Sequence, residues 1–388
     1  MTAAPTETSS LAKMPNRLGF IDGLRGLSAL YVALYHAAGD VPPPAPLLRL
    51  IAWPLQFGHY AVGVFIVLSG YCLMRPVARS MRGAVEGGLH AYAIRRARRI
   101  LPAYYAVLLL AIAAVAIART HYQPATGEEA DVLRLTPGTV ISHLLLIHNL
   151  RPDWAAAFDP PMWSVAAECQ IYVLFPLVLL PIWLRAGSFG VIAAAFSLGL
   201  APHFLLPTRL NLDWTFPWYI GLFALGMAGA SASFSRRPEE VRLRNRVPWG
   251  AAALLLGGLF AALAAWEPNL PIARLWLPDI LLGCAVSALL VKLALRSQMP
   301  PNIARGAAVW SLIAGILESR PARLLGACSY SLYLLHAPIL WALTCLLDIL
   351  HPSAGIAFIA RLLIGAPFAV GVSYAFYLLV ERRFLVNG

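Results

Sequence analysis

The chain has 388 residues, of which 60% are hydrophobic and 12% charged, and its formal net charge is +12. A soluble domain carries about 25% charged residues, so this composition excludes an ordinary soluble fold and predicts a chain embedded in lipid. The basic residues cluster in short loops between apolar stretches, and no zinc-finger spacing accompanies them. The positive charge therefore indicates membrane topology, and we expect no nucleic-acid partner.

The N-terminal segment is polar and lacks the apolar core of a signal peptide. We expect a short disordered cytosolic tail, 1–17, followed by one membrane domain, 18–384. The five cysteines are scattered through apolar stretches and form no CxxC pair. The sequence therefore predicts no metal site.

Apolar stretches of about 20 residues predict an all-α bundle with about ten membrane spans. The predicted spans are 18–38, 57–75, 100–118, 166–184, 188–206, 214–231, 248–266, 274–294, 326–349 and 355–380. A further apolar stretch, 138–150, is short for a crossing at about 1.5 Å per residue. If it dips into the membrane and returns, every basic loop falls on one side. We therefore expect a re-entrant segment, with both termini in the cytosol.

The first predicted span carries two ionisable residues, Arg25 and His36, on one face. Their separation of eleven residues makes about three helical turns, or roughly 16 Å along the axis. A charge in lipid costs about 2.5–3.5 kcal/mol, so such residues usually have a function. Asp22, one turn before Arg25, can neutralise it. Spacing alone also fits a structural role, in which His36 bonds a neighbouring helix and Arg25 extends to the interface.

Two later spans also carry ionisable residues. Glu168 begins the fourth span, at the depth expected for His36, where its carboxylate would orient the imidazole. The structural alternative is that an acidic residue favours the start of a helix. His336 lies about midway along the ninth span, at helical spacing from Tyr333 and Ser329. It is either a hydrogen-bonded core histidine or part of a substrate tunnel.

A dense basic cluster precedes the third predicted span. It consists of Arg95, Arg96, Arg98 and Arg99. Guanidinium groups bind phosphates in a bidentate manner, so the cluster is suited to coenzyme A, which carries a 3′-phosphate and a diphosphate. The positive-inside rule and anionic lipid headgroups also explain such a cluster.

At these residues the sequence resembles the acyltransferase-3 family, the membrane-bound O-acyltransferases of bacterial surface polysaccharides, nodulation factors and some antibiotics. FIDGLRGLSALYVALYH resembles the family's first helix, with its Arg-x10-His element. The other matching motifs, in chain order, are VGVFIVLSGY with Ser69, IRRARRILPAYY with Arg96 and Arg99, MWSVAAECQIYVLFP with Trp163 and Glu168, and SYSLYLLHAPIL with His336. Five motifs in order indicate the family more strongly than any one of them. Cys169 departs from the pattern, because the family has a second glutamate there.

The resemblance implies transfer of an acyl group, acetyl by family habit, from cytosolic acyl-CoA to a hydroxyl of a saccharide or glycolipid at the outer face of the cell's inner membrane. Acyl-CoA would be a co-substrate. It implies that His36 is a general base or a transient acyl carrier, oriented by Glu168, with Arg25 beside the donor. The expected phosphate-binding residues are Arg95, Arg96, Arg98 and Arg99. The expected tunnel or orienting residues are Asp22, Ser69, Trp163, Tyr333 and His336.

A second class of function also fits the sequence. Multiple spans, charges in the membrane and a re-entrant stretch occur in transporters and flippases of glycan or lipid intermediates. Inverted repeats would favour that class, and we find none. The acceptor, the acyl chain length and the oligomeric state stay open at this point.

Overall fold

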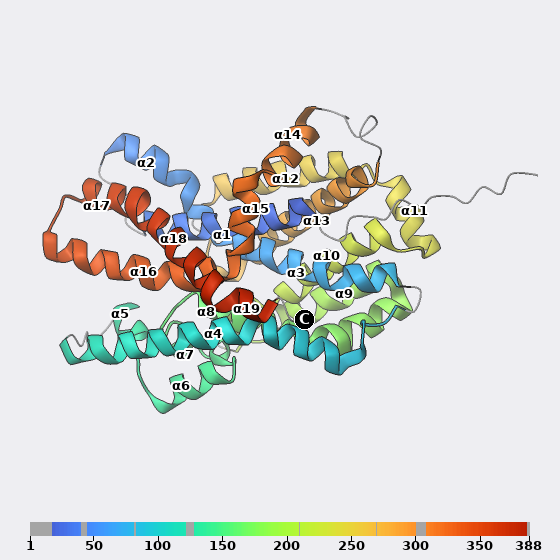
Figure 1. Cartoon of the computed structure of the whole chain (residues 1–388). Coiled ribbons are helices and arrows are strands. Elements are labelled where there is room, and N and C mark those ends of the chain that lie inside the picture. The colour runs from blue at the N-terminus through green and yellow to red at the C-terminus, as the bar shows by residue number, and fades with distance from the viewer. Residues whose placement is uncertain are drawn as a thin grey trace, which may run out of the picture.

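The computed structural model describes residues 18–39, 45–80, 83–121, 128–208, 210–268, 270–299 and 308–385. All regular structure in these ranges is helical, which confirms the predicted all-α bundle (Figure 1). The predicted tail, 1–17, lies outside the described residues. In chain order the α-helices are α1 (Gly19–Ala38), α2 (Pro46–Ala52), α3 (Tyr60–Arg79), α4 (Gly88–His121), α5 (Glu128–Val132), α6 (Pro137–Leu144), α7 (Pro152–Ala155), α8 (Met162–Leu174), α9 (Leu180–Leu205), α10 (Tyr219–Phe234), α11 (Pro238–Arg246), α12 (Trp249–Trp266), α13 (Trp276–Ser297), α14 (Ala308–Leu317), α15 (Arg320–Ala327), α16 (Ser329–Leu350), α17 (Ala354–Ala360), α18 (Ala366–Phe376) and α19 (Arg382–Leu385).

Short 3-10 and π-helical segments join or interrupt these helices. The 3-10 segments are η1 (Trp53–Phe57), η2 (His148–Leu150), η4 (Asp213–Thr215) and η5 (Ile272–Arg274). The π-helical segments are η3 (Phe175–Leu179), η6 (Arg361–Gly365) and η7 (Tyr377–Glu381). The π-helical segments lie inside long membrane helices, where widened turns of this kind often mark functional sites.

Seven helical stretches in the described part of the chain are long and apolar enough to cross a membrane. They are Pro46–Arg79, Gly88–Thr120, Met162–Leu205, Trp249–Trp266, Trp276–Ser297, Ser329–Leu350 and Ala354–Leu385. Gly187 breaks the third of these with a φ of 65°, a left-handed conformation that glycine adopts at little cost. The break separates the predicted fourth and fifth spans. The predicted first and sixth spans correspond to α1 and α10, of 20 and 16 residues.

The stretch expected to be re-entrant forms the short helix α6, of only 8 residues. Eight residues extend about 12 Å at 1.5 Å per residue, which is far less than a bilayer core. The chain then turns at Leu146, whose φ is 55°, and continues through η2. This geometry agrees with a segment that does not cross the membrane.

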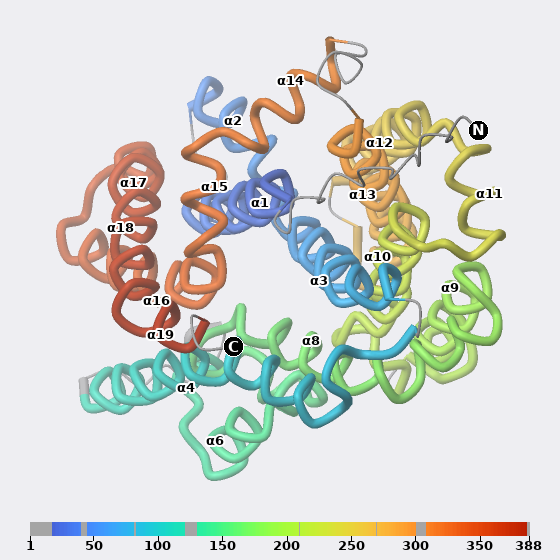
Figure 2. The backbone as a smooth tube through the Cα atoms, turned by 45° about the vertical axis from the view of Figure 1, so that its right-hand side comes forward, coloured from blue at the N-terminus to red at the C-terminus, as the bar shows by residue number. Residues whose placement is uncertain are grey.

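The centre of the bundle is formed by α1, α3 and α10 (Figure 2). α3 packs against α10 and α13, and α1 packs against α15 and α16. Two glycines allow α3 and α10 to approach closely, because a Cβ at Gly70 would overlap the backbone of Phe223, and one at Gly226 would overlap the backbone of Val67. α12 is largely exposed at the periphery. Close helix contacts through small residues are typical of membrane bundles.

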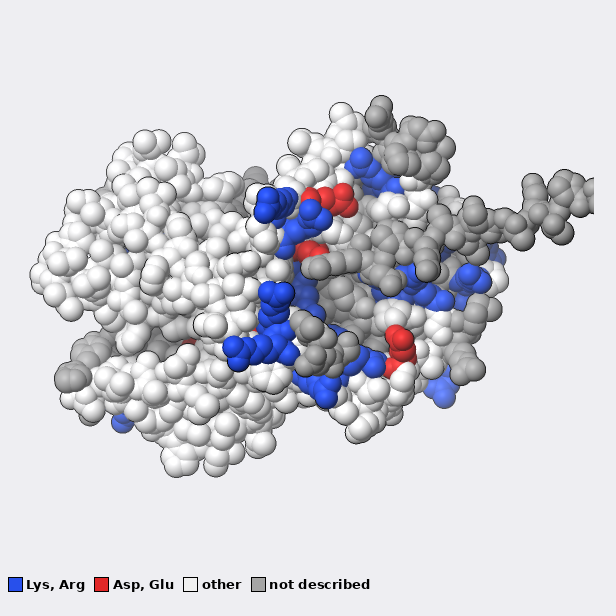
Figure 3. Space-filling model, in the orientation of Figure 1, with Lys and Arg blue, Asp and Glu red and all other residues white. Residues whose placement is uncertain are grey.

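On the face of the molecule that Figure 3 draws, basic side chains gather toward one end. In Figure 3 the surface over α2, α16 and α17 is almost free of Lys and Arg, whereas arginines are concentrated around the start of α4 and over α11, α15 and α19. We call the arginine-rich part the basic end and the part around α2 and α17 the opposite end. This asymmetry is the one that the positive-inside rule describes.

Candidate active site

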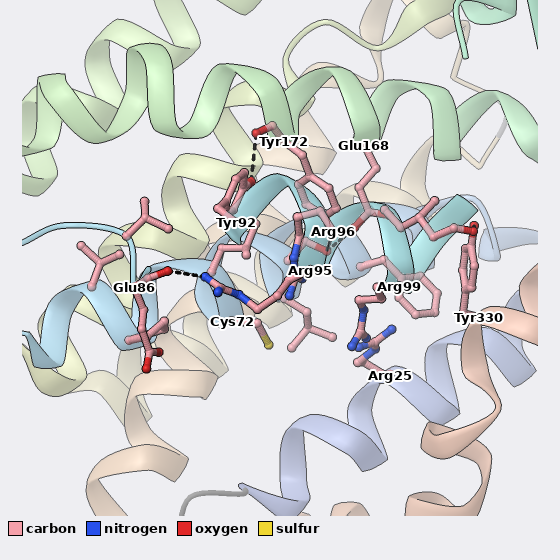
Figure 4. A pocket seen from close by; sticks show the side chains of 18 residues that line it. Arg25, Cys72, Glu86, Tyr92, Arg95, Arg96, Arg99, Glu168, Tyr172 and Tyr330 are labelled. Carbon is pink, nitrogen blue, oxygen red and sulfur yellow. Dashed lines mark hydrogen bonds between the residues drawn. The ribbon is translucent and has the colours of Figure 1, made fainter. Parts of the chain in front are cut away.

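A cavity of about 210 Å³ opens among α1, α3, α4 and α8 near the basic end (Figure 4). Arg25 of α1, Ser69 of α3 and Glu168 of α8 line it, together with arginines of α4. The cavity therefore joins four of the predicted motifs, which are far apart in the sequence. We call it the arginine cavity.

The helical geometry of α4 determines which arginines face the arginine cavity. It begins at Gly88, twelve residues before the predicted span, so the basic cluster lies on a helix instead of in a loop. Residues three or four apart share a face of a helix, and Arg95, Arg96 and Arg99 line the cavity. Arg98 is not among the lining residues and is exposed.

Arg25 and Arg99 lie side by side in the arginine cavity (Figure 4), and they are close enough to repel each other electrostatically. Arg95 is fixed at the rim, because its Nη2 donates a hydrogen bond to the carbonyl of Glu86 at 2.5 Å. Several guanidinium groups directed into one partly enclosed space attract an anion with more than one negative charge. The cavity has the chemistry of a phosphate site.

Glu168 is held by two hydroxyl groups. Its Oε1 accepts hydrogen bonds from Ser69 Oγ and, at 2.5 Å, from Tyr172 OH. We expected this carboxylate to lie against His36, and the geometry corrects that expectation. Its hydrogen bonds are made within the arginine cavity, where it also interacts electrostatically with Arg25.

A smaller pocket of about 50 Å³ continues from the arginine cavity. The two share Arg25, Ser69 and Glu168, and the smaller pocket extends to Ser164 and Tyr333. Ser164 Oγ and Tyr333 OH lie 2.6 Å apart, and Tyr333 OH donates to the carbonyl of Pro161 at 3.0 Å. The pocket therefore leads away from the arginines along the start of α8 and α16.

A pair of imidazoles, His36 and His336, lies beyond Tyr333. The rings of Tyr333 and His336 are 5.8 Å apart, and the rings of His336 and His36 are 4.9 Å apart. His336 Nε2 is 3.1 Å from His36 Nδ1. His336, which comes from α16, is therefore a hydrogen-bond partner of His36.

The hydrogen bonds define the tautomers of the pair. His336 Nδ1 lies 3.1 Å from the carbonyl of Leu332, which accepts only, so we assign a proton to this nitrogen. His336 Nε2 then accepts from His36 Nδ1–H, which also lies 3.0 Å from the carbonyl of Val32. In this tautomer the lone pair of His36 is on Nε2. A neutral imidazole held in this way can act as a base.

Two of the expected tunnel or orienting residues, Trp163 and Asp22, lie outside the lining of both cavities. The indole of Trp163 stacks on Phe216 with ring centres 4.7 Å apart, and Asp22 lies where α1 meets Gly326 of α15. Neither belongs to the described residues that line the arginine cavity or the smaller pocket. α1 and α15 approach closely here, because a Cβ at Gly26 would overlap the backbone of Gly326.

One acidic residue near the site was not anticipated. Glu381 of η7 is buried and accepts a hydrogen bond from Ser331 Oγ at 2.5 Å, next to Tyr330, which lines the arginine cavity. It lies in an apolar stretch beside two arginines, where the sequence suggests only the end of a span. A buried acid in a membrane helix is the signal that could have identified it.

The histidines of the stretch 138–150 form a separate pair. His143 and His148 stack with ring centres 3.8 Å apart, and both are buried. Burial lowers the pKa of His143 to about 4 and, with the nearby His143, the pKa of His148 to about 3. Both rings are therefore neutral at pH 7. Tyr104 of α4 fixes the segment by donating to the carbonyl of His143 at 3.0 Å.

Comparisons with known proteins identify the family. The chain is 24% identical to the peptidoglycan O-acetyltransferase OatA of Listeria monocytogenes, over 86% of this chain and 51% of the relative. It is 23% identical to the Bacillus subtilis protein named "Putative peptidoglycan O-acetyltransferase YrhL", over 86% of this chain and 50% of the relative. The chain thus spans about half the length of these curated relatives, and no solved structure matches it. The acyltransferase-3 model, described as an acyltransferase domain, matches residues 18–378, so the chain belongs to this family of acyltransferases.

Proposed function

We propose that the protein transfers an acyl group, most simply acetyl, from acyl-CoA to a hydroxyl of a saccharide or glycolipid across the membrane. The observation that carries the proposal is the arginine cavity and its continuation toward the His36–His336 pair. The names of the relatives support O-acetylation of a cell-envelope glycan. By the positive-inside rule the basic end faces the cytosol, with both termini there, and the opposite end faces outward.

In this proposal the arginine cavity receives the phosphates of acyl-CoA. Arg96 and Arg99 bind them, and Arg95 assists from the rim. Arg25 and Glu168 lie further in, where the amide groups of the pantetheine arm need both a donor and an acceptor. The rise of α1 from Arg25 to His36 is about 16 Å, which is of the order of an extended pantetheine. The thioester would therefore arrive near the imidazole pair.

His36 then removes the proton of the acceptor hydroxyl through Nε2, and the oxygen attacks the thioester carbonyl. The C–O bond forms, the C–S bond breaks, and the thiolate of CoA takes the proton from the imidazolium. His336 stabilises the orientation of His36 during this transfer, in the manner of an orienting group in a hydrolase triad. The thioester is already activated, so positioning and proton transfer supply the catalysis.

The test is acetyl transfer from radiolabelled acetyl-CoA by purified protein in vesicles made from the host's lipids and glycans. His36→Ala should abolish transfer while the protein stays folded and inserted. Arg96→Ala with Arg99→Ala should raise the apparent KM for acetyl-CoA by about tenfold or more, since hydrogen bonds to charged groups contribute about 1.5–3 kcal/mol each.

Arg98→Ala is the matched control, because Arg98 belongs to the same cluster but does not line the arginine cavity. It should leave the KM near that of the wild type. Full transfer by His36→Ala, or equal effects of the Arg98 and Arg96/Arg99 substitutions, would contradict the proposal.

A further inference from the structure

A group of aromatic rings gathers where α3, α8 and α10 begin. This is the end of the bundle away from the arginines, because α3 finishes at Arg79, whose guanidinium lies over the ring of Phe234 where α10 finishes. The buried Phe216 contacts two partly exposed rings there. Its centre is 4.7 Å from that of Trp163 and 4.9 Å from that of His59. We call these three residues the aromatic row.

Phe216 is held in an unusual backbone conformation. Its φ is 52° and that of Leu212 is 59°, a left-handed region that residues other than glycine rarely adopt. Asp213 fixes the loop between them, because it accepts a hydrogen bond from Asn211 Nδ2 at 2.7 Å and lies 3.0 Å from His203 Nδ1. Backbone strain of this kind is concentrated at functional sites. Here it places the ring of Phe216 against its two neighbours.

A buried carboxylate orients the imidazole of His59. Asp279 of α13 is 0% exposed, and its Oδ2 accepts a hydrogen bond from Trp218 Nε1 at 2.8 Å and lies 3.8 Å from His59 Nε2. Nε2 is buried although the side chain of His59 is 22% exposed, so the accessible part of the ring is the remainder, which carries Nδ1. With the proton on Nε2, toward the carboxylate, Nδ1 keeps a lone pair and can accept a hydrogen bond.

The aromatic row adjoins the smaller pocket on two helices. His59 lies one turn before Val62 of α3, which lines that pocket, and Val62 N donates to the carbonyl of His59 at 3.0 Å. Trp163 directly precedes Ser164 of α8, which also lines it. The same pocket reaches Tyr333, beside the imidazole pair. A ligand on the aromatic row would therefore lie just outside the pocket that leads toward those imidazoles.

We propose that the aromatic row is a subsite for the saccharide acceptor, in which a sugar ring stacks on Trp163 and one of its hydroxyl groups donates to His59 Nδ1. A sugar ring presents C–H groups on its face and hydroxyl groups at its edge, so it suits an aromatic surface beside an oriented hydrogen-bonding group. Asp279 is a positioning residue, since it is buried and acts through His59. The role as acceptor site rests on the proposed function, whereas binding itself can be tested without acetyl-CoA.

The first experiment varies the acceptor in the transfer assay, with the glycan fraction of the host's envelope as the probe. Trp163→Ala should raise the amount of glycan needed for half-maximal transfer by about fivefold to tenfold, since an aromatic contact is lost. The KM for acetyl-CoA should stay near the wild-type value, because Trp163 does not line the arginine cavity. Trp163→Tyr keeps an aromatic ring and should restore most of the acceptor affinity.

A tryptophan outside the aromatic row serves as the matched control. Trp266 at the end of α12 is 83% exposed, as expected for a residue that anchors a helix at the membrane interface. Trp266→Ala should change neither constant. Equal effects of the two alanine substitutions, or an equal rise of both constants in Trp163→Ala, would overturn the subsite.

The positioning role of Asp279 is tested separately. Asp279→Asn keeps an acceptor for Trp218 but removes the charge that orients His59, so the half-saturating amount of glycan should rise by about threefold or more. In a His59→Ala background the same substitution should not raise this amount further. A further rise there, or no rise in the wild-type background, would show that Asp279 only joins α13 to its neighbours.

Hydrogen–deuterium exchange tests binding without turnover. The glycan fraction alone should slow the exchange of backbone amides in 57–59 and 211–216 of the wild type, and Trp163→Ala should abolish this protection. Absence of protection in the wild type would overturn the subsite, while transfer from acetyl-CoA would still support the proposed function. If protection occurs but the wild type consumes no acetyl-CoA, the proposed function fails and the saccharide site stands.

Discussion

At the residue scale, His36 has a hydrogen-bond partner that lies 300 positions away in the chain. His336 Nε2 lies 3.1 Å from His36 Nδ1, and the backbone carbonyl of Leu332 fixes the tautomer of His336. The same hydrogen-bond direction places the lone pair of His36 on Nε2. An imidazole whose tautomer is set by a partner is a better-oriented base than an isolated one.

Replacement of His336 by Phe tests this relation. The ring volume stays similar, but the acceptor for His36 Nδ1–H is lost, so His36 can turn and change tautomer. We expect kcat to fall by about tenfold to a hundredfold, with the KM for acetyl-CoA near the wild-type value, because His336 does not line the arginine cavity. Kinetics in reconstituted vesicles would measure both constants. An unchanged kcat would mean that His336 is only a core residue.

The sequence indicates which residues share a face of one helix, but not which residues of other helices they contact. Helical periodicity is local, so it places Arg25 and His36 on one face of α1, and Tyr333 beside His336 on α16. Contacts between helices depend on lateral packing, which no periodicity encodes. For this reason Glu168 was expected beside His36 at equal depth, whereas its hydrogen bonds are with Ser69 and Tyr172.

At the element scale, hydropathy predicted the spans but not how far the helices extend beyond them. α4 begins at Gly88, before the apolar run, and this extension turns a loop of arginines into a helical face with a definite direction. The short α15 and the π-helical η7 have no clear signal in an apolar pattern, since both depend on tertiary packing. Glu381 was missed for this reason.

The contact between α3 and α10 supports a prediction about packing. A Cβ at Gly226 would overlap the carbonyl of Val67, on a backbone that cannot move without separating the two helices. We expect Gly226→Ala to lower the melting temperature in detergent and the activity together, because α3 also carries Ser69 of the site. Overpacking of this kind costs about 1–3 kcal/mol.

The control for this packing prediction is Gly258→Ala on α12, where an added Cβ meets nothing within 4 Å. Alanine is the better helix former, so this change should leave the melting temperature unchanged or slightly higher. If the two substitutions changed the melting temperature equally, helix propensity, and not the contact of α3 with α10, would determine that change.

At the scale of the whole molecule, the arginine cavity opens toward the end where the positive charge is concentrated. The arginine cavity opens near the basic end, and α1 runs from there past Arg25 toward His36 at its far end (Figures 1 and 3). A donor that enters among the arginines would therefore meet its acceptor on the other side of the bilayer. This geometry requires the two ends of the bundle to face different compartments.

Single cysteines can test that requirement in a Cys345→Ala background, which removes the exposed native thiol. Arg98→Cys marks the basic end, and Glu267→Cys marks the end of α12; both positions are exposed. Because basic segments stay in the cytosol, a membrane-impermeant maleimide should label position 267 in intact spheroplasts, and position 98 only in inverted vesicles. Labelling of both positions from the same side would place donor and acceptor in one compartment. Transfer across the membrane would then be excluded, even if the acyltransferase chemistry were intact.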